Sequence, residues 1–129
     1  MEIYVSQIEG RVPVTRLRLV GDFVEQEPIV NVAQKELDSG ATHILLDLTN
    51  VPFISSMGLR AIYAIYEKLE KNLGSEQSKL HEGIANGTYK SPHLKLLNPS
   101  KNSLKALTVG GFDMFLEILD DEAKVKTAF

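Results

Sequence analysis

The chain has 129 residues, of which 43% are hydrophobic, and this length suits one domain that buries roughly two-thirds of the surface its unfolded chain exposes. Its 14 basic and 17 acidic residues are mixed along the sequence, and the formal net charge of −3 with no dense basic stripe disfavours a nucleic-acid partner. The sequence lacks cysteine, which excludes disulfides and fits a reducing compartment, and no apolar run approaches the ~20 residues that span a bilayer, so we expect a cytoplasmic protein with no membrane insertion.

The first part of the chain shows strand signals followed by a helix signal. Two stretches rich in β-branched residues, Ile3 to Ile8 and Val12 to Val20, flank Glu9-Gly10-Arg11 and predict an antiparallel hairpin. A helix is expected from about Pro28, with Asp38-Ser39-Gly40 as its stop. The nearly continuous apolar run HILLDL, residues 43–48, then predicts a strand buried on both faces.

The middle of the chain carries the strongest helix signal. Apolar residues recur there at steps of three and four, at Leu59, Ile62, Tyr66, Leu69 and Leu73. Residues 74–92 then show no sustained period and contain three glycines. We interpret this segment, which is longer than a usual helix-to-strand loop, as an irregular insertion within a single domain that spans residues 1–129.

The last part of the chain repeats the alternation of strand and helix. LKLLN, residues 94–98, predicts a buried strand, and a helix capped by Ser100 should end at Gly110-Gly111. FLEIL, residues 115–119, predicts a last short strand, and a terminal helix is expected from Asp120. Because helices that alternate with single strands need crossover connections, we expect an α/β fold with a mixed, mostly parallel sheet, an antiparallel N-terminal hairpin and helices packed on the sheet.

Two serines, Ser55 and Ser56, lie where the HILLDL strand gives way to the long helix. A helix N-terminus offers free N–H groups and a partial positive charge, and a serine there is often only an N-cap worth ~1 kcal/mol. Two hydroxyls together with Gly58, which would let another backbone come close, also form a surface on which a phosphate can be added and tolerated. Met57 between them is either a core filler or an exposed anchor for a partner.

A different face of the same helix carries polar and charged residues. They recur at steps of three and four, at Arg60, Tyr63, Glu67 and Lys71. This face is either an ordinary solvated surface or a charged platform that begins beside the serines.

The sequence contains no recognisable catalytic or metal-binding constellation. His43, His81 and His93 belong to no triad-like motif, and no GxxxxGK[ST] phosphate loop is present. No histidines and carboxylates are paired at metal-ligand spacing. We therefore expect a protein that is not an enzyme and that uses no cofactor.

The order of the elements and the stretch DLTNVPFISSMGLRAI, residues 47–62, resemble the STAS domain of bacterial anti-sigma factor antagonists. The motif of that family reads approximately D-L-x-x-V-x-F-[IM]-D-S-[ST]-G-L. The positions that match it in register are Asp47, Leu48, Val51, Phe53, Ile54, Ser56, Gly58 and Leu59. The resemblance extends over the hairpin, the first helix, LKLLNPS and the GGF turn, and so covers most of the chain.

This resemblance implies a partner-switching protein. In the family, the unphosphorylated antagonist binds an anti-sigma factor that is also a serine protein kinase of the histidine-kinase-like ATPase fold, and a sigma factor is thereby released. Phosphorylation of the motif serine, which is Ser56 by register, ends that complex. The resemblance places the partner-binding face at Asp22, Ser55, Ser56, Met57, Gly58, Arg60 and Tyr63.

Three positions differ from the family pattern and favour an alternative. Ser55 stands where the family usually has aspartate, and Met57 stands where serine or threonine is usual. Val24 replaces the acidic residue that closes a G-x-L-D pattern, with Asp22 two residues earlier. The alternative is a STAS accessory or sensor subunit of a transporter or signalling assembly, in which Ser56 is only a cap and is not phosphorylated. A third interpretation is a scaffold whose 74–92 insertion carries the contact.

Overall fold

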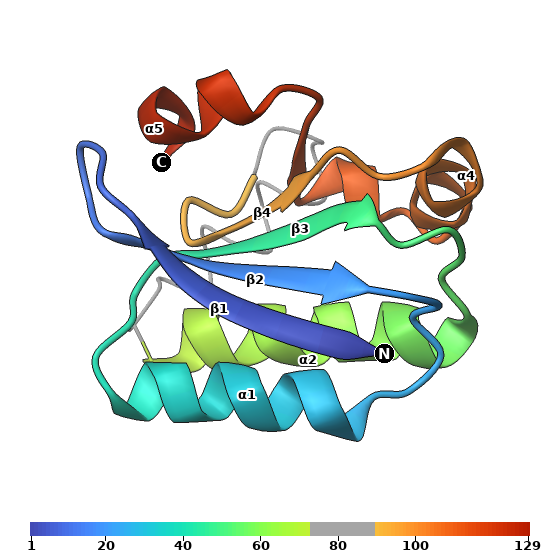
Figure 1. Cartoon of the computed structure of the whole chain (residues 1–129), viewed down its shortest axis with the longest axis horizontal. Coiled ribbons are helices and arrows are strands. Elements are labelled where there is room, and N and C mark those ends of the chain that lie inside the picture. The colour runs from blue at the N-terminus through green and yellow to red at the C-terminus, as the bar shows by residue number, and fades with distance from the viewer. Residues whose placement is uncertain (73–89) are drawn as a thin grey trace.

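The computed structural model describes residues 1–72 and 90–129 (Figure 1). Its five strands form one sheet in the order β1-β2-β3-β4-β5. Their bounds are Glu2–Ile8, Val14–Val20, Ile44–Asn50, Leu94–Leu97 and Glu117–Leu119. Strand β1 is antiparallel to β2, and every other neighbouring pair is parallel. The predicted α/β fold with an antiparallel N-terminal hairpin is confirmed.

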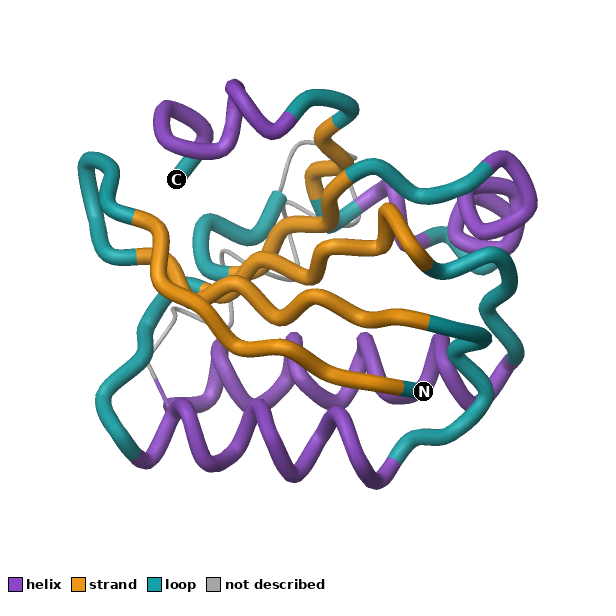
Figure 2. The backbone as a smooth tube through the Cα atoms, viewed as in Figure 1, coloured by secondary structure: helices purple, strands orange, loops and turns teal. Residues whose placement is uncertain are grey.

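Two long helices, α1 (Glu27–Asp38) and α2 (Ser56–Asn72), pack against each other below the sheet in Figures 1 and 2. Their buried residues, such as Ile29 on α1 and Ile62 on α2, meet Leu17 and Leu46 of the strands in the main core. The helix α4 (Lys101–Val109) adds Leu107 to this core. The apolar stripe predicted for α2 is therefore confirmed as far as Leu69.

The opposite face of the sheet is covered only in part. The C-terminal segment crosses it as a 3-10 turn, η2 (Glu122–Lys124), and a short helix, α5 (Val125–Ala128) (Figure 2). Val125 packs there with Leu45 and Leu97 in a second, smaller apolar cluster. Because side chains alternate along a strand, β3 sends Leu46 to one core and Leu45 to the other, as expected for a strand buried on both faces.

Local signals account for most element ends. Pro28 lies in the first turn of α1, where its missing N–H costs nothing, and Gly40 after the helix has a φ of 103°. The Ser100 side chain accepts a hydrogen bond of 3.1 Å from the Ser103 N–H, which confirms it as the cap of α4. Among the described residues, no helix is long and apolar enough to cross a bilayer.

Several predicted boundaries are wrong by a few residues, among them the end of β3, which extends to Asn50 rather than residue 48. Strand β2 begins at Val14 rather than Val12, because Pro13 has no N–H to give to the sheet. Strand β5 begins at Glu117, because the chain before it forms the 3-10 turn η1 (Phe112–Met114). The terminal segment is capped by Asp121 rather than Asp120, and it forms a 3-10 turn before its helix.

Several predictions fall on residues 73–89, which lie outside the described residues. These are Leu73 at the end of the α2 stripe, His81 and nearly all of the predicted 74–92 insertion. The insertion and the single domain over residues 1–129 therefore stay predictions.

Candidate functional site

The first turn of α2 is held in place by the loop that follows β2. The Phe23 N–H donates to the Phe53 carbonyl at 2.8 Å, and the Ser55 N–H donates to the Phe23 carbonyl at 3.0 Å. Phe23 and Ile54 thus form a short bridge with parallel β geometry, and the Phe23 side chain is fully buried. The loop that carries Asp22 and Val24 is therefore fixed beside the two serines.

Gly58 makes this contact possible. A Cβ added at residue 58 would lie closer than 3.0 Å to the Phe23 carbonyl oxygen and 2.8 Å from Cγ2 of Ile54. The prediction that Gly58 lets another backbone come close is confirmed. Gly58 is itself buried, so it positions the loop and offers no surface of its own.

The two serines have different surroundings. Ser55 precedes the first residue of α2, and its Oγ accepts a hydrogen bond of 3.4 Å from the Gly58 N–H, so Ser55 is the N-cap. Ser56 is the first residue of the helix and is exposed. Among the residues that the structure describes, none makes a hydrogen bond with the Ser56 hydroxyl. The view that Ser56 is only a cap is therefore wrong, since Ser55 holds that position.

Large apolar side chains are exposed on both elements that form this junction. The exposed fractions are 44% for Val24, 49% for Phe53 and 39% for Met57. Met57 is thus not a core filler, and the choice left open by the sequence is decided in favour of an exposed side chain. Apolar surface that stays exposed beside a helix N-terminus is typical of a protein contact.

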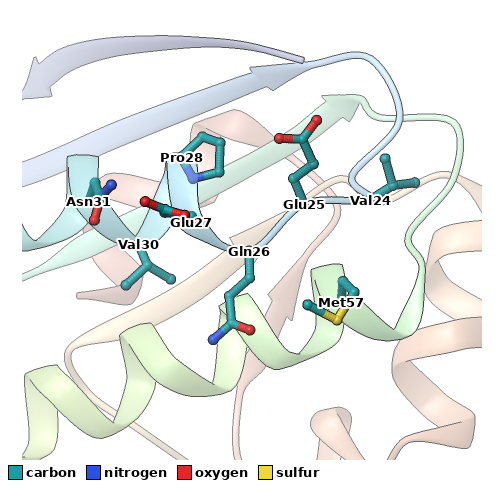
Figure 3. A pocket seen from close by; sticks show the side chains of 8 residues that line it. All are labelled: Val24, Glu25, Gln26, Glu27, Pro28, Val30, Asn31 and Met57. Carbon is teal, nitrogen blue, oxygen red and sulfur yellow. The ribbon is translucent and has the colours of Figure 1, made fainter.

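Two hollows flank the exposed side of α2. The first, of about 560 Å³, lies between the start of α1 and the first turn of α2 (Figure 3), and its lining consists of Val24, Glu25, Gln26, Glu27, Pro28, Val30, Asn31 and Met57. The second, of about 430 Å³, follows α2 and is lined by Gln26, Leu59, Arg60, Tyr63, Ala64, Glu67 and Phe112. Both are open and mix apolar with charged groups, which suits another protein surface better than an enclosed small molecule.

The structure brings the predicted site residues to one region of the molecule. Asp22 is exposed in the loop that contacts Ser55, and Arg60 and Tyr63 are exposed further along α2. Sequence reasoning missed Phe23, which binds the loop to the start of α2, and Gln26, which lines both hollows. The only sequence signal for them was their place just before the α1 pattern.

The first acid of the motif, Asp47, is structural. Its side chain is buried on the sheet face opposite α2, where it accepts hydrogen bonds from Thr49 Oγ1 at 2.6 Å and from Arg16 Nε at 3.0 Å. Burial acts to raise the pKa of Asp47, but the hydrogen bonds from Thr49 and Arg16 outweigh it and hold this pKa below its ordinary value. Asp47 is therefore charged at neutral pH, and its hydrogen bonds link β3 to Arg16 of β2.

The described histidines lie far from the serines. His43 and His93 precede the amino ends of β3 and β4, whereas Ser55 and Ser56 follow the carboxyl end of β3. A strand of this length spans roughly 20 Å, so neither ring can act as a base for either serine. Burial lowers the pKa of His43. Within residues 1–72 and 90–129, no group of three or more His, Asp or Glu side chains could hold a metal ion.

The five-stranded sheet and the two long helices on one face form a small α/β fold that is also seen in SpoIIAA. The chain belongs to the STAS domain family, whose model matches residues 7–75, more than half of its length. No curated protein matches the sequence.

Solved structures that share the fold include two forms of SpoIIAA and a transporter family protein. SpoIIAA of Bacillus in its phosphorylated form is 18% identical over 99% of this chain and 100% of its own, with a TM-score of 0.65. The anti-sigma factor antagonist SpoIIAA in its unphosphorylated form is 16% identical over 96% and 93%, with a TM-score of 0.60. A sulfate transporter family protein from Wolinella succinogenes is 20% identical over 88% and 82%, with a TM-score of 0.61.

Proposed function

We propose that this chain is an anti-sigma factor antagonist that works by partner switching. The observation that carries the proposal is Ser56, which matches the motif serine and is exposed in the first turn of α2 with a hydroxyl that no described residue engages. In this proposal the unphosphorylated protein binds an anti-sigma factor that is a serine kinase of the histidine-kinase-like ATPase fold. A sigma factor is released, and phosphorylation of Ser56 ends the complex.

The chemistry of a phosphate at residue 56 supports such a switch. A phosphoserine adds about −1.5 to −2 charges at neutral pH, and the N-terminus of α2 stabilises negative charge by about 0.3–1 kcal/mol. The folded domain therefore tolerates the modification. A partner that covers Met57 and Phe53 would have to bury the same phosphate, and a buried charge without a matching cation costs several kcal/mol.

A phosphate on Ser56 can supply much of the difference in partner affinity that a switch requires. Moving a two-state equilibrium from 1:99 to 99:1 takes about 5.5 kcal/mol of differential binding. Desolvation of one phosphate and repulsion by a like charge in the partner can supply several kcal/mol of that amount. The switch needs no change of fold in this chain.

We further propose that the chain acts in the cytoplasm by binding and performs no catalysis. The separation between the described histidines and Ser56 supports this view, because a nucleophilic serine needs an adjacent base. Met57 and Val24 give the surface an apolar character that suits a protein partner.

A second candidate function is an accessory or sensor subunit of a transporter or signalling assembly. It is favoured by Met57 and Val24, which stand where the resemblance leads us to expect polar and acidic residues, and by the fold shared with a sulfate transporter family protein. In that case Ser56 carries no phosphate, and the hollow of Figure 3, which combines apolar and charged side chains, holds the other subunit.

Parallel affinity purifications from the source organism test the two functions. The baits are wild type, Ser56→Ala and Ser56→Asp, with Asn102→Asp as a control that adds a charge to the first turn of α4. Partner switching predicts that an ATPase-fold kinase or anti-sigma factor is captured by every bait except Ser56→Asp. Incubation of that partner with ATP should then place one phosphate on Ser56 of the wild type. Equal capture of a transporter subunit by all four baits would contradict the first function and support the second.

A further inference from the structure

A polar hollow of about 230 Å³ lies on the sheet face opposite α1 and α2, away from the serines. It is lined by Arg16, Arg18, Asp47, Thr49, Asn50, Leu97, Asn98 and Glu122. These residues come from β2, β3 and β4, from the residue that follows β4 and from the C-terminal segment, and most of them lie toward the carboxyl ends of the strands. In open α/β sheets, ligands bind beyond the carboxyl ends of the strands, and this hollow lies on the sheet face near those ends.

Within residues 1–72 and 90–129, no acidic side chain pairs with Arg18, the second cation of the hollow. Arg18 is partly buried, and its guanidinium lies 4.7 Å from the centre of the Tyr4 ring. No hydrogen bond or ion pair joins it to any other residue that the structure describes. A guanidinium has five N–H donors in a planar fork that matches a carboxylate or a phosphate, so Arg18 can donate hydrogen bonds to a bound oxyanion.

Arg16 is already bound to two carboxylates of different character. It pairs with Asp47, whose side chain is fully buried, and with Glu122, whose side chain is 62% exposed. The buried pair fixes the position of Arg16, since Asp47 is also held by Thr49. The exposed Glu122 carboxylate occupies the remaining side of Arg16, as an anionic ligand would.

An amide donor completes the hollow. Asn98 has a φ of 51°, the only positive value among the described residues other than glycine, and its Nδ2 lies 3.4 Å from Thr49 Oγ1. The backbone at this residue is fixed by a hydrogen bond of 2.7 Å from the Asn98 N–H to the Leu119 carbonyl. A non-glycine residue in this region of φ is uncommon, and such residues cluster at ligand sites.

We propose that this hollow binds a small oxyanion, the phosphate or carboxylate group of a small molecule. Arg18 and the Asn98 amide donate to the oxyanion, and Arg16 joins them when the Glu122 carboxylate moves away. The site lies on the other face of the sheet from Ser56 and does not depend on the function proposed above.

Titration with defined anions tests the proposal. The probes are inorganic phosphate and succinate, measured by isothermal titration calorimetry and by the shift in thermal midpoint, with sodium chloride at matched ionic strength as the reference. We expect Arg18→Gln to weaken binding of the active probe about tenfold, as the loss of one charge-assisted pair does. Lys105→Gln, which removes an exposed cation on α4, is the matched control and should bind as wild type does.

Two further variants separate binding from stability. Glu122→Gln removes the competing carboxylate and should tighten binding about threefold, whereas a purely structural ion pair predicts lower stability and no gain in affinity. Asn98→Gly keeps a backbone that favours positive φ and removes the amide, so it should weaken binding while the protein stays folded. A response to phosphate alone or to succinate alone identifies the recognised group. Shifts no larger than those with chloride, or unchanged affinity in both Arg18→Gln and Glu122→Gln, would overturn the proposal.

Discussion

The substitution Gly58→Ala tests the contact that positions the switch region, because two physical effects predict opposite signs. Alanine favours a helix over glycine by up to about 1 kcal/mol, so propensity alone predicts a more stable protein. The new methyl group would lie closer than 3.0 Å to the Phe23 carbonyl oxygen. That oxygen is held by the Ser55 N–H at 3.0 Å and cannot turn away without breaking the bridge.

The difference between the steric cost and the gain in helix propensity gives the expected change in the free energy of unfolding. Overpacking costs about 1–3 kcal/mol, and a clash with backbone belongs near the upper end, so we expect Gly58→Ala to lose about 2 kcal/mol after the gain in propensity. With a urea m-value of about 2 kcal/mol/M, the unfolding midpoint should fall by about 1 M. The assay is urea unfolding followed by circular dichroism, since the chain has no tryptophan.

Gly110→Ala is the matched control for this experiment. Gly110 has an ordinary φ of −77°, and an added Cβ would meet the Phe112 ring at 3.1 Å, which is a side chain that can shift. We expect its midpoint to stay within about 0.3 M of the wild type, consistent with a small change in stability. A midpoint for Gly58→Ala equal to or above that of the wild type would refute the argument that the Phe23 loop needs glycine at this position.

Four other substitutions should change stability in the following ways. Ser55→Ala should lower the free energy of unfolding by about 0.5–1 kcal/mol because it removes the cap of α2, whereas Ser56→Ala should change it by less than about 0.5 kcal/mol. Thermal unfolding of the two variants side by side measures this difference, and equal losses would contradict the roles assigned to the two serines. Phe23→Ala should cost about 3–5 kcal/mol because its side chain is fully buried, and a loss below about 1 kcal/mol in urea unfolding would argue against that packing. Asp47→Asn should cost about 2–3 kcal/mol at pH 7, since it weakens charge-assisted hydrogen bonds from Arg16 and Thr49. The pKa of Asp47 is lowered in the folded protein, so its contribution is complete above the ordinary pKa of about 3.9 and is lost as the pH falls through the lower folded value. The loss of unfolding free energy in Asp47→Asn relative to the wild type should thus be constant from about pH 7 to 5 and become smaller in strong acid. A loss that instead grows in acid would show that the folded protein raises the pKa of Asp47.

The two proposed binding sites lie on opposite faces of the sheet. Partner switching requires the exposed Ser56 at the start of α2, while the oxyanion site requires Arg18 on the other face. A Ser56→Asp variant that still responds to phosphate, and an Arg18→Gln variant that still captures the partner, would show that the two sites are independent.

Local patterns in the sequence determined the elements and their order. The steps of three and four from Leu59 to Leu69 require a helix with one apolar face, and an apolar run such as HILLDL requires a strand covered on both sides. The motif around Ser56 likewise depends on residues close in the chain. Such signals are readable because helix periodicity, capping and strand burial act over only a few residues.

The tertiary structure alone decided which contacts these elements make. It showed that Ser55 and not Ser56 is the cap, that Met57 is exposed, and that the Phe23 carbonyl leaves no room for a side chain at residue 58. It also joined Arg16 to Glu122, which lies 106 residues away in the chain. These contacts depend on strand register and on the path of the crossovers, and no short stretch of sequence contains that information.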